Sequence, residues 1–288
     1  MKNTLLIIGY GYTASYIAQL FSQNNCWHVI GTSRTQKPDD LIIPYERESI
    51  ARSLKIATHV IISVPPDDQG DAVLNDFGDL FYEFESLKFP KLEWIGYLSA
   101  TSVYGNHDGD LVNEESILKP SSARAINRIR AEEQWFELGQ KYKITVNIFR
   151  LAGIYGPKRN AIEQVKNGSA KSIFKEGQMF SRIHVEDIAQ IILAAVNMKD
   201  AKAQIYNLAD DHPCATIDVN NYAAKLLGVE PPNVIAIEDA QLSEMAQEFY
   251  SDNKRICNRK IQELLKIKLK YPTYRQGLLT IYNGTLCN

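Results

Sequence analysis

Residues 5–14 read LLIIGYGYTA, and this stretch decides the fold. Four uncharged apolar residues are typical of a buried strand, and the glycines at positions 9 and 11 allow the chain to turn sharply into a helix. Further along, short apolar runs alternate with segments of helical period, the pattern of a parallel sheet with crossover helices. The sequence therefore predicts an α/β fold with a doubly wound parallel sheet, whose strands lie at Thr4–Ile8, Trp27–Thr32, Leu41–Ile43, His59–Val64, Trp94–Ser99, Thr145–Phe149 and Ile205–Leu208.

The glycine turn has the spacing G-x-G-x-x-A between a strand and a helix, the setting of a dinucleotide-binding turn in a Rossmann-type sheet. Gly9 permits the tight turn, Gly11 lets the backbone approach a pyrophosphate without a Cβ in the way, and Ala14 allows the helix to pack closely on the strand. The alternative is an ordinary glycine turn. Because the match opens a strand-helix-strand pattern, we expect a nicotinamide dinucleotide to contact Gly9, Tyr10, Gly11, Tyr12 and Thr13.

The end of the second expected strand bears on the choice of cofactor. It reads Thr32-Ser33-Arg34, where a protein that prefers NAD(H) usually carries an acid for the ribose 2′-hydroxyl. The nearest acid, Asp39, lies five residues beyond Arg34. An Arg beside a hydroxyl suits a 2′-phosphate through charge-assisted hydrogen bonds, so we expect Ser33 and Arg34 to select NADP(H) over NAD(H). The alternative is that Arg34 is an ordinary surface residue.

The composition limits the class of partner. The net charge of −2 gives no electrostatic footprint for nucleic acid or an anionic membrane. The four cysteines have no CxxC spacing, which indicates neither a metal site nor a disulfide framework and fits a reducing cytoplasm. No apolar stretch has the roughly 20 residues that span a bilayer. We therefore expect a cytoplasmic protein with a small-molecule substrate, no metal, no nucleic-acid or membrane partner, and a homodimer as its assembly.

The composition of the sequence changes beyond about Gly156, where a polar, basic segment follows. We expect a Rossmann domain at residues 1–156 with returning segments at about 184–210. A smaller C-terminal α/β lobe, built from about 157–183 and 211–288, is expected to bind the substrate. Within that lobe, apolar residues at helical spacing predict a helix over Asp218–Leu227, and Gly228 stands where a left-handed cap would end it.

Four further motifs carry a family resemblance: LSATSVYG at residues 98–105, RLAGIYGP at 150–157, HVEDIA at 184–189 and YNL at 206–208. With the glycine turn, they resemble the extended short-chain dehydrogenase/reductase superfamily, the NAD-dependent epimerase/dehydratase group, and specifically its atypical members. The resemblance implies strand order 3-2-1-4-5-6 plus a seventh strand, and a smaller domain that closes over the substrate. Such proteins typically act on nucleotide sugars with a Ser or Thr, a Tyr as general acid/base, and a Lys.

The chain departs from that pattern at each of these three catalytic positions. The hydroxyl position falls on Ala100, and alignment of the family's Glu on Glu132 places Arg124 at the Tyr position and Arg128 at the Lys position. A guanidinium cannot exchange a proton near neutral pH, so Arg124 is no general base. Arg128 can still donate hydrogen bonds to ribose hydroxyls, and Arg124 suits an anionic substrate. The alternative is two solvated arginines on a helix face.

The catalytic residue is thus unknown from sequence, with Thr101 and Tyr155 as weak candidates. The resemblance implies further cofactor contacts at Ser63, Val64, Ser99, Arg128 and Leu151, and substrate contacts at Arg124, Tyr155 and Arg182.

Two functions remain open. The first is an NADP(H)-dependent oxidoreductase or epimerase that acts on a small anionic or nucleotide-sugar-like substrate with an atypical active site. The second is a non-catalytic NADP(H)-binding sensor or regulatory protein, in which the fold survives without the chemistry.

Overall fold

The computed structural model describes residues 2–35, 41–82, 92–198 and 202–286. The chain forms two compact units. The first unit comprises Met1–Val103, Ala123–Arg150 and Ile188–Tyr206, and the second unit comprises Tyr104–Ser122, Leu151–Asp187 and Asn207–Asn288. Within the described ranges, no helix is long and apolar enough to cross a membrane.

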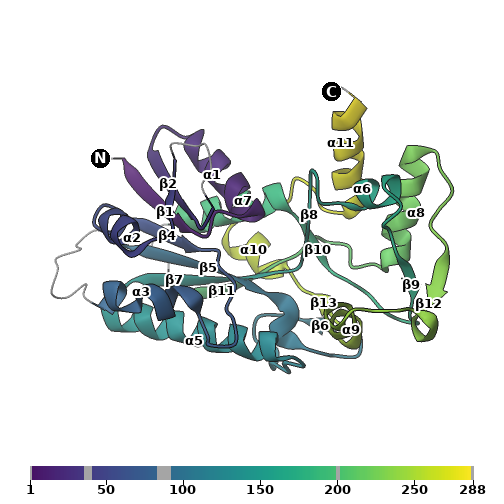
Figure 1. Ribbon diagram of the computed structural model, residues 1–288, viewed down its shortest axis with the longest axis horizontal. Helices are drawn as coiled ribbons and strands as arrows, with labels where there is room; N and C mark the ends of the chain where they lie inside the picture. Colours follow the sequence, from purple (N-terminus) through teal and green to yellow (C-terminus); the bar gives the residue numbers. More distant parts are fainter. Residues whose placement is uncertain (1, 36–40, 83–91, 199–201, 287–288) are drawn as a thin grey trace. The chain divides into compact units, whose positions relative to one another are not determined.

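The central sheet has seven strands in the order β11-β7-β5-β4-β1-β2-β3 (Figure 1). This is the order that the family resemblance implies, and each predicted strand is confirmed. Strand β1 pairs with β2 and β4, β2 pairs with β3, and β4 pairs with β5, all in parallel. The strands cover Asn3–Ile8 (β1), Trp27–Ser33 (β2), Ile42–Pro44 (β3), His59–Ile62 (β4), Trp94–Ala100 (β5), Thr145–Leu151 (β7) and Gln204–Leu208 (β11).

The inner strands form because their residues are apolar on both faces, as a sheet covered by helices on both sides requires. Every residue of Leu5–Ile8 and of His59–Ile62 is buried. One buried cluster joins Leu6 and Ile8 to residues of α2, α3 and α5. The helices of this unit are α1 (Tyr12–Ser22), α2 (Arg47–Leu54), α3 (Ala72–Tyr82), α5 (Ala123–Tyr142) and α7 (Val185–Val196), of which α7 starts in the second unit.

The second unit contains three small parallel strand pairs, β8 with β10, β9 with β12 and β6 with β13. The helix predicted over Asp218–Leu227 is present as α8 (Thr216–Leu227), and its C-cap is Gly228 with φ of 68°. The other elements are η1 (Thr101–Tyr104, which begins in the first unit), β6 (Leu111–Val112), β8 (Gly153–Tyr155), α6 (Ala161–Lys166), β9 (Ser172–Phe174), β10 (Arg182–His184), β12 (Val234–Ala236), η2 (Ile237–Asp239), α9 (Glu244–Ser251), β13 (Arg255–Ile256), α10 (Arg259–Leu264) and α11 (Tyr274–Leu286).

The bounds of the units differ in detail from the predicted domain bounds. Residues 104–122, which the sequence assigns to the Rossmann domain, group with the second unit because β6 pairs with β13. The predicted division of labour, cofactor in one part and substrate in the other, stays a prediction.

Candidate cofactor and substrate sites

The glycine turn is held between the ends of two neighbouring strands. Gly9 has φ of +97°, and a Cβ there would lie 2.7 Å from Val64 Cγ2 and 3.0 Å from Val64 N. Its own N–H donates to Thr32 Oγ1 at 3.1 Å, and the N–H of Tyr10 donates to the Thr32 carbonyl at 2.7 Å. Only glycine fits this position, because the left-handed backbone and the close approach of β4 both exclude a side chain.

Gly11 differs from Gly9 because it faces open space. It is exposed, and a Cβ there would have no described heavy atom within 4 Å. It is the N-cap of α1, no side chain caps that helix, and no acid stands in its first turn. A helix N-terminus with an open approach is a fitting place for a pyrophosphate, because N–H groups and the helix dipole both favour an anion there. The residues present therefore fit a dinucleotide.

The remaining predicted cofactor residues of this region lie on α1 and directly after β4. Tyr12 and Thr13 are the first two residues of α1; Thr13 is buried, and the ring of Tyr12 lies 5.3 Å from that of Tyr16. Ser63 and Val64 directly follow β4, and the Ser63 N–H donates to the Ile8 carbonyl at 2.8 Å. These residues therefore gather at the carboxyl ends of β1 and β4, where open α/β sheets bind ligands.

Sequence reasoning missed Gly31. It lies in β2, and a Cβ on it would overlap the ring of Tyr10. The signal was present, because a glycine inside a strand often marks a site where another group approaches closely. Thr32 is likewise a missed residue of the turn, since its buried hydroxyl accepts the N–H of Gly9.

The end of β2 carries the residues predicted to choose the cofactor. Ser33 is its last residue, and its hydroxyl lies 3.2 Å from Thr35 Oγ1. Arg34 is exposed, and its guanidinium lies 5.1 Å from the centre of the Tyr45 ring. Asp39 lies outside the described residues. The sequence contains no signal for Tyr45, because it is brought to Arg34 by the pairing of β2 with β3.

Helix α5 carries Arg124 and Arg128, the two arginines at the predicted Tyr and Lys positions. Arg124 is exposed, whereas Arg128 is half-buried and its Nη1 donates to the Leu98 carbonyl at 2.9 Å. Asp71 is buried, and burial raises the pKa of its carboxyl, although Leu74, Trp135 and the charge of Arg128 oppose the rise. The guanidinium of Arg128 thus ties the helix to β5.

A buried ion pair lies beside this position. Glu132 and Arg150 are both buried, and Arg150 Nη2 lies 2.6 Å from Glu132 Oε2. The hydroxyl of Ser99 donates to the same carboxylate. Ser99 is therefore engaged inside the protein by its side chain, while Ala100 and Thr101 follow it at half-buried positions. A direct role of any of them towards a ligand stays a prediction.

Tyr155 lies in the second unit, on the strand pair formed by β8 and β10. It is 7% exposed, its hydroxyl donates to the Thr273 carbonyl at 3.5 Å, and its ring lies 5.1 Å from that of His184. Burial, with Asp210 and Asp187 adding to it, raises the pKa of this phenol far above its usual range. Such a phenol holds its proton at neutral pH.

Arg182 is on β10, beside Tyr155. Its Nη1 donates to the Phe180 carbonyl at 3.0 Å, to the Cys214 carbonyl at 3.1 Å and to Cys214 Sγ at 3.2 Å. Arg182 also lines a pocket of about 360 Å³ within the second unit, together with Tyr155, Arg159, Asn160, Gln164 and Tyr274 among others. The hydroxyl of Tyr274 is buried and has no hydrogen-bond partner among the described residues.

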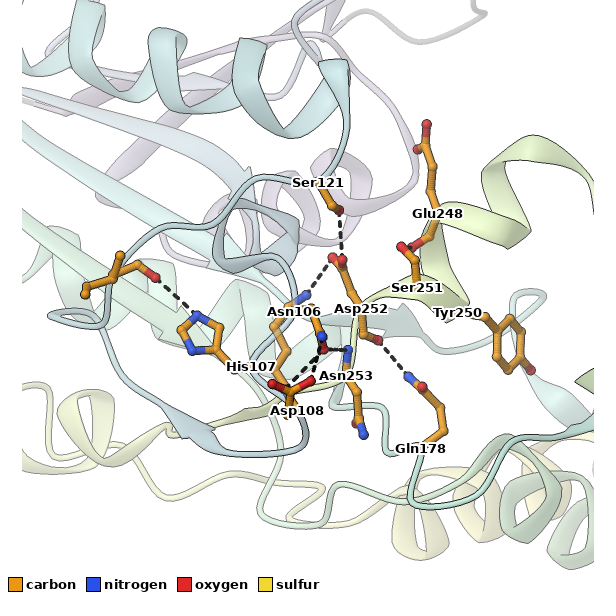
Figure 2. Close-up of polar contacts among 12 residues, drawn as sticks. Asn106, His107, Asp108, Ser121, Gln178, Glu248, Tyr250, Ser251, Asp252 and Asn253 are labelled. Carbon is orange, nitrogen blue, oxygen red and sulfur yellow. Dashed lines mark hydrogen bonds and ion pairs between the residues drawn. The ribbon is translucent and has the colours of Figure 1, made fainter.

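A polar network in the second unit holds the connection that precedes α5 (Figure 2). The Ser121 hydroxyl donates to Asp252 Oδ1 at 2.8 Å, and the Asn253 N–H donates to Asn106 Oδ1 at 3.0 Å. From another segment, Gln178 Nε2 donates to the Asp252 carbonyl at 2.7 Å. The connection is thereby fixed at both of its ends.

The structure gathers the predicted cofactor residues of β1, β2 and β4 in the first unit, and Tyr155 and Arg182 in the second. Leu151 is buried at the end of β7 and also belongs to the second unit. Arg124 and Arg128 lie one turn apart on α5, away in sequence from both groups.

Comparison with known proteins agrees with this architecture. Residues 88–209 match the NAD dependent epimerase/dehydratase family. A stretch of 172 residues is 24% identical to a trifunctional UDP-glucose 4,6-dehydratase, UDP-4-keto-6-deoxy-D-glucose 3,5-epimerase and UDP-4-keto-L-rhamnose-reductase of Arabidopsis thaliana. That match covers 56% of the chain and only 26% of the longer plant protein.

Solved structures resemble the whole chain. A conserved protein of unknown function from Silicibacter pomeroyi is 40% identical, with a TM-score of 0.83 and coverage of 99% of both chains. The UDP-glucuronic acid 4-epimerase of Bacillus cereus, in complex with UDP-glucuronic acid and NAD, is 17% identical with a TM-score of 0.78, covering 97% of this chain and 98% of its own. The dTDP-glucose 4,6-dehydratase of Bacillus anthracis, in complex with NAD, is 16% identical with a TM-score of 0.79, covering 99% and 97%.

The glycine turn, the strand order and the likeness to these solved structures define a Rossmann-type α/β fold. The similarity to the NAD dependent epimerase/dehydratase family covers residues 88–209 of the chain.

Proposed function

We propose that the protein binds NADP(H) and acts as an oxidoreductase or epimerase on a small anionic or nucleotide-sugar-like substrate, with an active site that lacks the usual Tyr/Lys pair. The observation that carries this proposal is the open approach to Gly11 at the uncapped N-terminus of α1. A structural turn gains nothing from such an approach, whereas a pyrophosphate needs it.

The preference for NADP(H) is supported by the end of β2. Arg34 provides a cation there, and Thr35, the one described residue that directly follows it before the next gap, is not an acid. A carboxylate at this place would repel a 2′-phosphate, whereas a guanidinium binds it with two parallel hydrogen bonds. The two related structures named above hold NAD, so the choice of NADP(H) is a proposal about this chain's own residues.

The nature of the substrate is supported by the pocket of the second unit. Arg159 and Arg182 give its lining two positive charges, and the unpartnered Tyr274 hydroxyl supplies a further polar atom. Guanidinium groups favour carboxylate and phosphate. The related plant and bacterial enzymes are named for UDP and dTDP sugars, which are anionic through their diphosphates.

A bound nicotinamide would supply hydride transfer, and the chain's residues would have to supply binding and proton transfer. Gly9, Gly11 and the N-terminus of α1 would hold the pyrophosphate, and Arg34 the 2′-phosphate. Neither Arg124 nor Arg128 exchanges a proton near neutral pH. Thr101 stays as the candidate hydroxyl, and Tyr155 as a weaker one because its phenol resists ionisation.

A second candidate function is a non-catalytic NADP(H)-binding sensor or regulatory protein. One specific observation favours it. At two positions that are catalytic in the superfamily, Arg128 donates to the Leu98 carbonyl and Ala100 has no hydroxyl, so the first side chain has a structural contact and the second cannot take part in proton transfer. The cytoplasmic location and the homodimer predicted from sequence belong to either function and stay predictions.

Calorimetric titration with NADPH and NADH tests the cofactor. A screen of UDP and dTDP sugars tests the reaction: NADPH absorbance follows net reduction of the sugar, and chromatography of the sugar products follows epimerisation, which regenerates its cofactor. Tight binding of NADPH with turnover of any anionic sugar supports the enzyme. Tight binding with no turnover across the screen supports the sensor, and the absence of binding contradicts both.

A further inference from the structure

Tyr45 is fixed between the core and Arg34. It directly follows β3, and its N–H donates to the carbonyl of Ser33 at 2.9 Å. On one side its ring meets Phe77 of α3 edge-on, with ring centres 5.0 Å apart, and its hydroxyl donates to Asp76 Oδ2 at 3.0 Å. On the other side the guanidinium of Arg34 lies 5.1 Å from the ring centre. The Tyr45 ring, held by these contacts, therefore forms a fixed platform for the Arg34 guanidinium.

Two arginines lie near this platform, and Arg34 is the one whose guanidinium lies over the Tyr45 ring. Arg47 is paired with Asp79, and it also donates to the Asp76 carbonyl at 3.4 Å. Arg34 makes no ion pair within the described part of the chain. Burial raises the pKa of the Tyr45 phenol, Asp76 raises it further, and Arg34 opposes the rise, so the ring stays neutral and keeps its π face for a cation.

We propose that Tyr45 is a positioning residue for cofactor choice, whose ring holds the Arg34 guanidinium in the orientation that receives the 2′-phosphate of NADP(H). This inference rests on the proposed function, because it presupposes that Arg34 meets that phosphate. The physical reason is that an exposed Arg loses rotamer freedom when it binds phosphate. A guanidinium already stacked on an aromatic ring loses less of that freedom, so it binds the same phosphate more tightly.

The test compares two side chains of similar size at position 45. Tyr45→Phe keeps the π face, whereas Tyr45→Leu keeps an apolar side chain against Phe77 without one. Calorimetry measures the dissociation constants of NADPH and NADH for each variant, and of 2′,5′-ADP and 5′-AMP as probes that isolate the 2′-phosphate. Tyr45→Leu should weaken the binding of NADPH and 2′,5′-ADP about two- to tenfold, the cost of ordering one free side chain on binding, with the binding of NADH and 5′-AMP unchanged. Tyr45→Phe should retain the selectivity of the unmutated protein.

The outcomes separate this inference from the proposed function. If the unmutated protein binds NADPH and NADH equally, the proposed cofactor choice is wrong and the role of Tyr45 is wrong with it. If the unmutated protein prefers NADPH but Tyr45→Leu weakens all four ligands alike, or none, Tyr45 is only structural and the cofactor choice stands. Thermal denaturation confirms that each variant is folded. Tyr45→Met, an unbranched side chain, replaces the Leu variant if that one unfolds.

Discussion

Replacing Gly11 with Val tests the cofactor site with little disturbance of the fold. Gly11 has φ of −96° and ψ of −163°, which any residue adopts, and a Cβ there meets no described heavy atom within 4 Å. The cost to stability is that of a poorer N-cap, about 0.5–2 kcal/mol. The new side chain occupies the space through which a pyrophosphate would approach the helix N-terminus.

The effect on binding is much larger. Each charge-assisted hydrogen bond that is lost costs about 1.5–3 kcal/mol, roughly one to two decades in affinity. A pyrophosphate pushed away from the N-terminus of α1 loses more than one of them, so NADPH should bind at least about a hundredfold more weakly. Calorimetry measures the affinity. A folded Gly11→Val protein with unchanged affinity for NADPH would falsify the placement of the site.

Gly9→Ala is the matched contrast, two residues away in the same turn. Here φ is +97°, and the added Cβ would lie 2.7 Å from Val64 Cγ2 and 3.0 Å from Val64 N. The positive φ costs about 1–2 kcal/mol and the overpacking about 1–3 kcal/mol, so the variant should lose about 2–5 kcal/mol of unfolding free energy. Urea denaturation of both variants checks the pair. Equal stabilities would show that the turn is built differently.

The remaining predictions concern charge and proton chemistry. Arg34→Asp should narrow or reverse the preference for NADPH, since the lost contact is worth about 1.5–3 kcal/mol; calorimetry with both cofactors decides, and equal affinities before mutation would exclude the preference. Glu132→Ala should lower the free energy of unfolding by about 3–5 kcal/mol, because it removes the carboxylate that pairs with the buried Arg150. Glu133→Ala, at an exposed position, should change the free energy of unfolding by no more than about 0.5 kcal/mol; urea denaturation measures both. Burial raises the pKa of the Asp210 carboxyl from 3.8 to about 7, so the folded protein keeps this proton where the unfolded chain has lost it. The free energy of unfolding should therefore fall as the pH rises from about 4 towards 7, and Asp210→Asn should remove this fall. Identical pH profiles of the unfolding free energy in the two proteins would contradict this. Common nucleotide sugars should turn over very slowly because Arg124 cannot exchange a proton near neutral pH, and turnover in the usual range of about 1–10³ s⁻¹ would rule out the sensor. The triple variant Ala100→Ser, Arg124→Tyr, Arg128→Lys should remain folded by circular dichroism.

The sheet could be predicted from the sequence because its signals are local. Buried strands such as Leu5–Ile8 are short, wholly apolar runs, and the glycines that follow mark the turn wherever the rest of the chain goes. The α8 cap is equally local, since Gly228 adopts the left-handed conformation that its position predicts. The order of the strands came from the family resemblance, and the structure confirms it.

The surroundings of the candidate site could not be predicted, because they depend on pairings between distant segments. Tyr45 reaches Arg34 only through the register of β2 with β3, and the polar contacts of Ser121 with Asp252 join positions 131 residues apart. The tie of Arg128 to the Leu98 carbonyl likewise requires α5 to lie along β5. At these positions the residue type indicates which interactions are possible. Only the folded structure shows which group each side chain contacts.

On the proposed function, the arginines of α5 would separate cofactor binding from catalysis. Binding would depend on backbone groups at the glycine turn and on Arg34, and the open approach to Gly11 fits a dinucleotide. Proton transfer needs a group whose pKa lies near the working pH, and a guanidinium at position 124 has none. Since Arg128 donates to a strand carbonyl, it stabilises the packing of α5 on β5 whether or not a substrate is present. On this proposal the scaffold would bind its cofactor without a proton-transferring Tyr at position 124, and any activity would draw its proton from a group other than Arg124 and Arg128.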